Sequence, residues 1–173
     1  MKKIKVFILA TIFALTCAVG AYAQNAAMKV AYVDLSKVFD EYTKTKEYDK
    51  VLEGKHSAFE KEHNDKLKII KDSQEKLSLM KDEEKNKMLE QLDKQKAELL
   101  EFDRQKQADL RKQRDEKIRE ILLEIEKIIK DYAMQEKYNL VFNDKVLAYA
   151  DESMDITAPV LKLLNDKYAG QGK

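Results

Sequence analysis

The sequence has few of the residues that cross-link, bend or interrupt a chain. Among its 173 residues are one cysteine, one proline, four glycines and no tryptophan. A single cysteine excludes an internal disulfide, so the fold must rest on packing and hydrogen bonds alone. Residues 46–137 contain no proline and only one glycine, Gly54, so nothing there interrupts a helix. The shortage of helix-breaking residues therefore predicts a long helical region.

Residues that commonly carry catalysis are also scarce or scattered. The two histidines, His56 and His63, are seven positions apart, whereas two helix histidines that share a metal are four apart. That spacing favours partly buried positions on a seam between helices, on a stripe that also includes Leu52 and Phe59. The chain has no glycine-rich phosphate loop, and none of its many carboxylates stands out as a buried general acid. We therefore expect no enzyme activity, no cofactor and no metal site.

The sequence also lacks a large excess of positive or negative residues. Lysine and arginine total 33, and aspartate and glutamate total 32, which gives a formal net charge of +1. A general nucleic-acid binder carries a basic footprint, so this balance argues against that class. One local exception is the stretch 104–119, where seven basic residues accompany three acidic ones. This basic cluster is either a solvated helix face or a contact for a partner or an anionic lipid, and the sequence leaves both open.

The first 23 residues have the three parts of a secretory signal peptide. "MKKIK" is basic, "VFILATIFALTCAV" is apolar, and "AYA", ending at Ala23, is a small-x-small cleavage motif. Cleavage after Ala23 would remove three lysines and the cysteine, leaving 30 basic and 32 acidic residues and a charge of −2. Cys17 could instead carry a lipid, although Ala14 and Thr16 fit a lipoprotein site poorly. The sequence therefore predicts an exported protein.

The mature chain begins with two contrasting zones. Residues 29–45 open with a short β-rich run and continue into a short helix that Asp34 or Ser36 can cap. Residues 46–137 hold 47 charged residues out of 92, with apolar residues every three or four positions. This spacing is typical of a coiled-coil seam. The most polar stretch, 79–88, is the candidate tip of a helical hairpin.

The C-terminal zone returns to β-rich sequence. Two runs, "LVF" and "VLAYA", flank Asn143 and Asp144, a pair that suits the tight turn of a β-hairpin. A last helix follows, for which Asp155 or Thr157 is the expected N-terminal cap. We therefore predict two strands and one short helix after the long charged region.

The positions of the strands decide the course of the helical region between them. A single helix over 46–137 would span about 140 Å at 1.5 Å per residue and would hold the two β-rich zones far apart. Strands at 29–34 and 139–149 can share one sheet only if the intervening chain goes out and returns. The sequence therefore favours an antiparallel helical hairpin.

Three segments together resemble a known family. "KVAYVDLSKVFDEY", the charged helical middle and "YNLVFNDKVLAYADESMDITAPVLKLLN" are similar, in that order, to the Skp/OmpH family of periplasmic chaperones. The resemblance implies an α+β fold, mostly helical, with a small β-strand trimerisation body and a long antiparallel α-helical hairpin in each subunit. It assigns 1–23 to the signal peptide, 24–45 and 138–173 to the body with short helices, and 46–137 to the arm.

The resemblance also implies a function. Such proteins are ATP-independent periplasmic holdases, which bind unfolded outer-membrane proteins in a cavity between helical arms and prevent their aggregation. We therefore expect a homotrimer whose partners are unfolded β-barrel proteins and not nucleic acid. The best-known members are clearly basic, whereas this mature chain carries −2, so contact with a membrane or lipopolysaccharide stays open. The alternative function is that of an exported coiled-coil structural or adaptor protein of the cell envelope.

Two sets of candidate residues accompany this interpretation. Those for the buried surface of the trimer body are Val30, Tyr32, Leu140, Phe142, Val146 and Ala148. Those for client contact are Phe59, Met80, Met88, Phe102, Arg111 and Arg114. The two methionines flank the expected tip, and the two arginines belong to the basic cluster. Ordinary seam packing or solvent exposure is the alternative role for the client-contact set.

Overall fold

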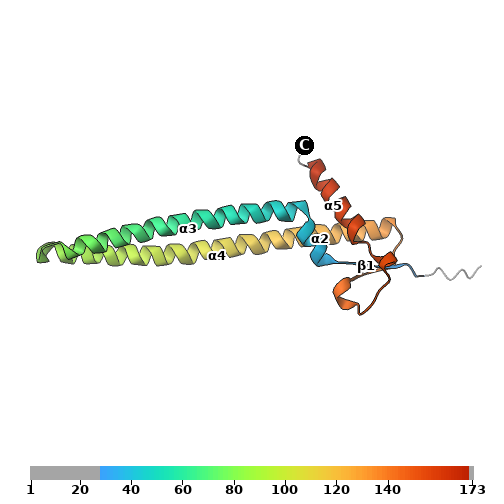
Figure 1. Ribbon diagram of the computed structural model, residues 1–173, viewed down its shortest axis with the longest axis horizontal. Coiled ribbons are helices and arrows are strands. Elements are labelled where there is room, and N and C mark those ends of the chain that lie inside the picture. Colours follow the sequence, from blue (N-terminus) through green and yellow to red (C-terminus); the bar gives the residue numbers. More distant parts are fainter. Residues whose placement is uncertain (1–27, 172–173) are drawn as a thin grey trace, which may run out of the picture.

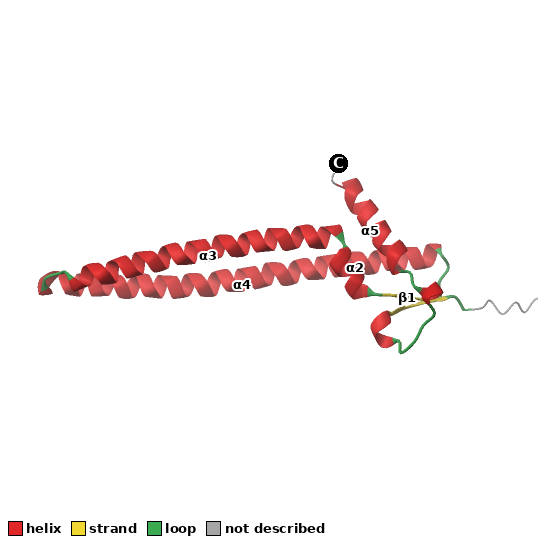
Figure 2. Cartoon of the chain, in the orientation of Figure 1, coloured by secondary structure: helices red, strands yellow, loops and turns green. Residues whose placement is uncertain are grey.

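The structure, a computed structural model, describes residues 28–171 as a pair of long antiparallel helices joined to a small body (Figure 1). The predicted signal peptide, its expected cleavage position after Ala23, and Cys17 lie outside the described residues. Helix α3 is Thr43–Ser78 and helix α4 is Asp82–Gln135. Helices dominate the described chain, and the strands are confined to one end (Figure 2). The predicted fold class, mostly helical α+β with a long helical hairpin, is confirmed.

The arm reverses direction at residues 79–81, inside the polar stretch that was the candidate tip. Leu79 closes α3 by donating its backbone N–H to the carbonyl of Lys76 at 3.0 Å, and Lys81 takes an extended conformation before α4. Helix α3 has 36 residues and α4 has 54, which correspond to lengths of about 54 and 81 Å. Helix α4 therefore continues past the start of α3 and runs beside the body (Figure 1).

The body begins with strand β1 (Val30–Val33) and helix α2 (Leu35–Glu41). Asp34 caps α2 as predicted, because its Oδ1 accepts a hydrogen bond from the backbone N–H of Lys37 at 2.8 Å. Tyr42 has an extended backbone, with φ −64° and ψ 126°, between α2 and α3. This single extended residue lets the chain change direction from the body into the arm.

Strand β2 (Leu140–Asn143) pairs in parallel with β1, with Val30 opposite Leu140 and Tyr32 opposite Phe142. The chain therefore does go out and return before its two ends share a sheet, as predicted. Lys137 makes the turn between α4 and β2 with a φ of 59°. This left-handed conformation costs a non-glycine residue about 1–2 kcal/mol.

The predicted β-hairpin around Asn143 and Asp144 is wrong. The chain forms the 3-10 helix η1 (Asp144–Val146) there, and residues 147–150 are not a strand. Asn143 has a φ of −74°, whereas a two-residue hairpin turn requires positive φ, and its Oδ1 accepts instead from the backbone N–H of Lys145. The run "VLAYA" therefore leaves the sheet.

The second edge of β1 is occupied by a later segment. After the 3-10 helix η2 (Glu152–Met154), Asp155 forms a bridge with Tyr32, and the N–H of Ile156 donates to the Tyr32 carbonyl at 2.9 Å. This bridge lies on the edge of β1 away from β2, so it does not take the place of the predicted strand, which would have paired with β2. It is η1 that carries residues 146–150 away from the free edge of β2. The sheet of the described residues therefore has two strands.

Helix α5 (Thr157–Gln171) projects sideways from the base of the arm (Figure 1). Of the two predicted cap residues, Asp155 caps its start, and Thr157 bonds a different segment. Asp155 Oδ1 accepts from the N–H of Thr157 at 2.8 Å, and Thr157 Oγ1 accepts from the N–H of Asp34 at 2.9 Å. Thr157 therefore ties the start of α5 to the junction between β1 and α2.

The main core lies where α2, α4, α5 and β1 meet. Its most deeply buried side chains are Val38, Tyr42, Ile121, Ile125, Val160 and Leu164. Residues Ala31 and Val33 of β1 face this core. A second, smaller cluster lies out on the arm and consists of Ile70, Leu92 and Leu99, with Leu67 and Phe102 packed against it. The arm is therefore closed by apolar packing at its base and in its outer half, with a stretch between them that depends on other contacts.

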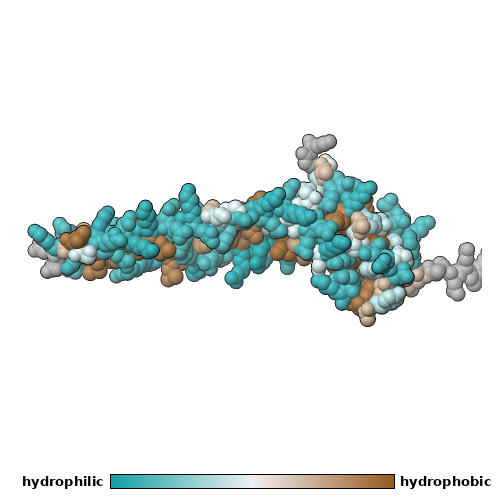
Figure 3. Space-filling model, in the orientation of Figure 1, coloured by the Kyte–Doolittle hydropathy of each residue, from teal (hydrophilic) through white to brown (hydrophobic). Residues whose placement is uncertain are grey.

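The surface of the arm is mostly hydrophilic, with separate apolar patches (Figure 3). Within residues 28–171, no helix combines the length and the apolar composition that a membrane span requires.

Candidate assembly and binding surfaces

One face of the sheet carries apolar side chains that the single chain leaves accessible. Successive residues of a strand point to opposite faces, so Val30 and Tyr32 lie away from the core. Their partners in the register, Leu140 and Phe142, are 46% and 38% exposed. Four of the six predicted body residues therefore lie on one outward face of the sheet.

The other two predicted body residues are not in a strand. Val146 ends η1 and is 70% exposed, and Ala148 lies in the loop that follows and is also exposed. They do not extend the sheet, because the chain turns away after Asn143. Any part that they take in assembly must come from the loop.

The outer edge of β2 has no partner strand among residues 28–171, since the sheet order is β1 then β2. A free strand edge presents unpaired N–H and C=O groups and readily pairs with another chain. Here, the exposed side chains of Leu140 and Phe142 accompany that edge. The outer edge of β2 therefore combines unpaired backbone groups with exposed apolar side chains.

An apolar groove lies between the sheet and α4. It has a volume of about 340 Å³ and is lined by Val33, Leu35, Leu122, Ile125, Glu126, Ile129, Val141, Phe142 and Asn143. Leu122, on the α4 side, is 44% exposed, which makes it as accessible as the sheet residues opposite. Together, the groove and the outward sheet face form what we call the body surface.

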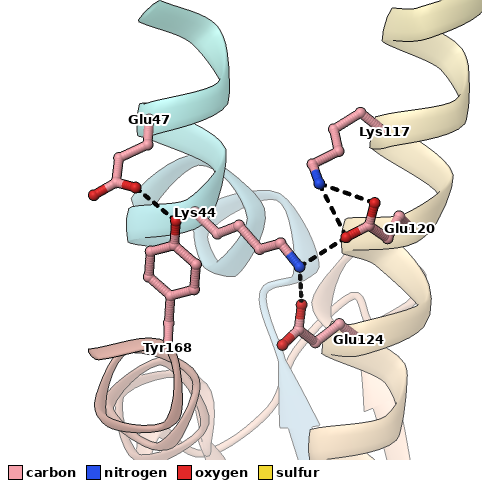
Figure 4. Close-up of polar contacts among 6 residues, drawn as sticks. All are labelled: Lys44, Glu47, Lys117, Glu120, Glu124 and Tyr168. Carbon is pink, nitrogen blue, oxygen red and sulfur yellow. Dashed lines mark hydrogen bonds and ion pairs between the residues drawn. The ribbon is translucent and has the colours of Figure 1, made fainter. Parts of the chain in front are cut away.

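A charge network joins the two arm helices at their base (Figure 4). Lys44 Nζ on α3 lies 2.8 Å from Glu120 Oε1 and 2.8 Å from Glu124 Oε2 on α4, and Lys117 Nζ also contacts Glu120, at 2.9 Å. Hydrogen bonds from Lys44 and Lys117 hold the pKa of Glu120 below its usual value. Burial by itself lowers the pKa of Lys44, but its hydrogen bonds to Glu120 and Glu124 outweigh that effect and raise it.

Helix α5 is fastened to the same base. The hydroxyl of Tyr168 donates to Glu47 Oε2 at 2.6 Å, and this bond raises the tyrosine pKa. Asn165 Oδ1 accepts from the N–H of Thr43, the first residue of α3, at 2.9 Å. The ring of Tyr168 also meets Tyr42 edge-on, with centroids 5.9 Å apart. These contacts fix the direction in which the arm leaves the body.

Farther out, aromatic and charged contacts hold the arm together. Phe59 on α3 stacks on Phe102 on α4, with centroids 5.8 Å apart and planes inclined by 27°. One turn along α3, His63 Nδ1 lies 2.8 Å from Asp103 Oδ1. His63 therefore occupies the seam as predicted, but His56 does not. The side chain of His56 is 63% exposed and pairs with Glu60 on its own helix.

Between these contacts and the base, the two helices leave an open groove of about 350 Å³. Its lining is Leu52, His56, Phe59, Gln107, Leu110, Arg111 and Arg114. The residues of α4 in this stretch are mostly polar, so the helices cannot close against each other through apolar packing. We call this the arm groove. It combines three apolar side chains with two guanidinium groups and no carboxylate.

Comparison with known proteins identifies the family of this chain. The model of the family described as outer membrane protein (OmpH-like) matches residues 29–164. The chain belongs to the OmpH-like family. The match spans β1, the whole arm and the first half of α5, and it confirms the resemblance carried by the two ends of the sequence.

The fold of this OmpH-like chain is also similar to a solved structure. A crystal structure of an OmpH-like candidate outer membrane chaperone from Caulobacter crescentus CB15 matches with a TM-score of 0.76 and 13% sequence identity. The alignment covers 82% of this chain and 86% of the other. No curated protein sequence is similar enough to match. At this low identity, the likeness shows a shared fold.

The predicted client-contact residues of the OmpH-like chain fall into two places. Phe59, Arg111 and Arg114 line the arm groove, and Phe102 stacks behind Phe59. The other two, Met80 and Met88, are half-buried near the turn of the arm, far along the helices from that groove. No group of three potential metal ligands occurs within the described part of the chain.

The sequence analysis did not predict the charge network around Lys44 at the base of the arm, which we call the base network, or the part of the body surface that Leu122 contributes. Ile121, Leu122 and Leu123 are three consecutive apolar residues, which is more than one seam can bury on a helix. That excess was the available signal for a second apolar surface. The base network had no comparable signal, since Lys44 and Glu124 are 80 positions apart in a chain rich in both residue types.

Proposed function

We propose that this protein is an ATP-independent periplasmic holdase that keeps unfolded outer-membrane proteins from aggregating. In this proposal it is exported through a signal peptide cleaved after Ala23, and it assembles as a homotrimer whose arms enclose a cavity. Its membership of the OmpH-like family and its likeness to a candidate outer membrane chaperone support the chaperone role. No nucleotide-binding loop was found in the sequence, which is consistent with an activity driven by binding alone.

The observation that carries the proposal is the separation of two kinds of surface. At one end lies the body surface, with the free edge of β2 and the exposed Leu122, Leu140 and Phe142. At the other end lies a long, charged arm with scattered apolar patches (Figure 3). Assembly through the body surface buries apolar groups that a lone chain leaves in water, and it gathers several arms around one space.

Such an arrangement suits the physical problem of an unfolded β-barrel protein. Its alternating apolar residues and unpaired strand edges associate readily with other copies. Arms that surround one client keep other chains away, while charged arm surfaces keep the complex soluble. Contacts that are individually weak hold the client without trapping it, so no ATP is needed for release.

The proposal is tested by the solution mass of purified residues 24–173, alone and mixed with an equimolar outer-membrane barrel diluted from urea. We expect a trimer that keeps the barrel soluble as a complex of three chains with one client. A monomer or dimer that lets the barrel aggregate contradicts the proposal. That result would favour the exported coiled-coil adaptor instead.

A further inference from the structure

Three of the four exposed leucines on α4 follow an eleven-residue repeat, and the fourth, Leu123, stands outside it. Leu89, Leu100 and Leu122 are 42%, 73% and 44% exposed, and Arg111 occupies the one remaining position of the repeat. Eleven residues make three turns of an α-helix, so each step returns to almost the same side, with a drift of about 20° and a rise of about 16 Å. These four residues therefore form a line along one flank of α4, which we call the flank line.

The flank line lies on the same side of the arm as the arm groove. Leu99 is buried in the seam between the two helices, with Glu98 just before it and Leu100 just after it. Each residue of an α-helix is rotated by about 100°, so Glu98 and Leu100 lie on opposite flanks of the seam. Arg111 repeats the position of Leu100 and lines the arm groove. The groove therefore opens on the Leu100 flank.

The opposite flank has apolar residues of its own. Glu98 lines a separate groove together with Ile69 of α3, so Ile69 lies on the flank away from Leu100. Val51 precedes Ile69 by eighteen residues, or five full turns, and shares its side of α3. Val51 and Ile69 are 52% and 53% exposed. The two flanks thus offer similar apolar residues for a direct comparison.

The flank line continues the body surface. Leu122, at its inner end, lines the apolar groove between the sheet and α4. If the body surface is buried between copies, the flank that begins at Leu122 faces the space between the arms. The flank with Val51 and Ile69 then faces away from that space. This step rests on the proposed function.

Arg111 gives the middle of the flank line a specific chemistry. Arg114, beside it in the groove, is paired with Asp115 at 3.0 Å, whereas Arg111 has no ion-pair partner among residues 28–171. The apolar side chains of Leu52, Phe59 and Leu110 lie in the same groove. A guanidinium group beside apolar side chains fits a carboxylate carried next to an apolar residue.

The size of the groove bounds what it holds. Leu52 and Phe59 are seven residues apart on α3, a distance of about 10 Å, which matches about three residues of extended chain. An extended client segment that crosses the groove therefore reaches the apolar floor and Arg111 together.

We infer that the flank line and the arm groove form the client-binding track of each arm. The track takes an extended, apolar segment of an unfolded chain, and Arg111 receives a carboxylate of that segment. The leucines at 89 and 100 provide separate apolar contacts toward the tip.

The first test compares the two flanks in the full mature protein. Leu89→Ser with Leu100→Ser removes the track leucines, and Val51→Ser with Ile69→Ser removes two exposed apolar residues from the opposite flank. Circular dichroism and native mass establish that both variants fold and assemble like the parent. The probe is a fluorescently labelled, urea-unfolded outer-membrane barrel, and its affinity is measured by titration. We expect about tenfold weaker binding for the first variant and an unchanged affinity for the second.

The second test addresses the carboxylate. Two ten-residue peptides of alternating valine and tyrosine differ only in a central glutamate or glutamine. We expect Arg111→Gln to lower the affinity for the glutamate peptide about fivefold and to leave the affinity for the glutamine peptide unchanged. Arg119→Gln, which removes the same charge from α4 outside the groove, should affect neither peptide.

The outcomes separate this inference from the proposed function. Suppose that the parent protein keeps the barrel soluble, but the two flank variants lower the affinity for the barrel equally, or neither lowers it. The inference about the track is then wrong, while the proposed holdase function is retained. If Arg111→Gln lowers the affinity for both peptides equally, the inferred contact between Arg111 and a carboxylate is wrong. If the parent protein does not hold the barrel at all, the proposed function itself fails.

Discussion

The ammonium group of Lys44 lies 2.8 Å from the carboxylate of Glu124, and each of these side chains is only 17% exposed. The pair joins the first turns of α3 to α4, next to the contacts that fasten α5. A charge pair in such a sheltered place is sensitive to the loss of one partner, because the other is left without a counter-charge. The direction of the arm therefore depends on a few polar contacts as well as on the apolar core.

Lys44→Met should destabilise the base of the arm by about 1–3 kcal/mol, because Glu124 loses its partner in a sheltered site. Urea denaturation followed by circular dichroism measures the change. Lys117→Met is the matched control, since Glu120 keeps Lys44 when Lys117 is removed. If the two variants lose equal free energy of unfolding, the Lys44–Glu124 pair does not contribute more to stability than the more exposed Lys117–Glu120 pair.

Acid should weaken the same network. Because the pKa of Glu120 is lower in the folded protein than its usual 4.5, its contribution is complete above that value and is lost as pH falls through the folded pKa. Glu120→Gln should therefore lower the thermal midpoint at pH 7, and the difference from the parent should shrink as pH falls below 4.5. A difference between parent and variant that stays constant over this range would rule out the hydrogen-bonded carboxylate as its cause.

Phe142→Asp should dissociate the assembly, because it places a charge without a partner on the body surface. Native mass is expected to fall to that of one chain while the helical circular dichroism signal is retained. Leu79→Asp is the control, since Leu79 is 88% exposed at the turn of the arm, away from the body. An unchanged native mass for Phe142→Asp would remove β2 from the assembly surface.

Changing Met80 and Met88 together to Ser should weaken client capture a few-fold and leave assembly intact, since flexible thioether side chains adapt to many partners. Light scattering of a urea-diluted barrel measures capture, and native mass measures assembly. Met134→Ser provides the comparison, because Met134 is 62% exposed at the opposite end of α4. Unchanged capture would assign the tip methionines to packing between α3 and α4.

Local signals in the sequence were enough for much of the fold. The lack of helix breakers and the seam spacing predicted α3 and α4, and Asp34 and Asp155 act at the helix starts where their short polar side chains suggested. These features depend on neighbours a few positions away, which is why they can be read from the chain alone. The family was recognisable for the same reason, since its two end segments keep their order and pattern.

Other features depend on residues that meet only after folding. "VLAYA" has the composition of a strand, yet the chain turns into η1 after β2 and the run pairs with no strand, while Asp155 bridges to Tyr32 on the far edge of β1. Likewise, Phe59 and Arg111 are 52 positions apart in the sequence, and only the return of α4 along α3 brings them into one groove. The sequence by itself determined the two long helices, the first strand and the helix caps, because propensity and capping are local. The tertiary structure alone decided which strand edge stays free, which lysine is sheltered and where the arm stays open, because each depends on competition among distant segments for the same space.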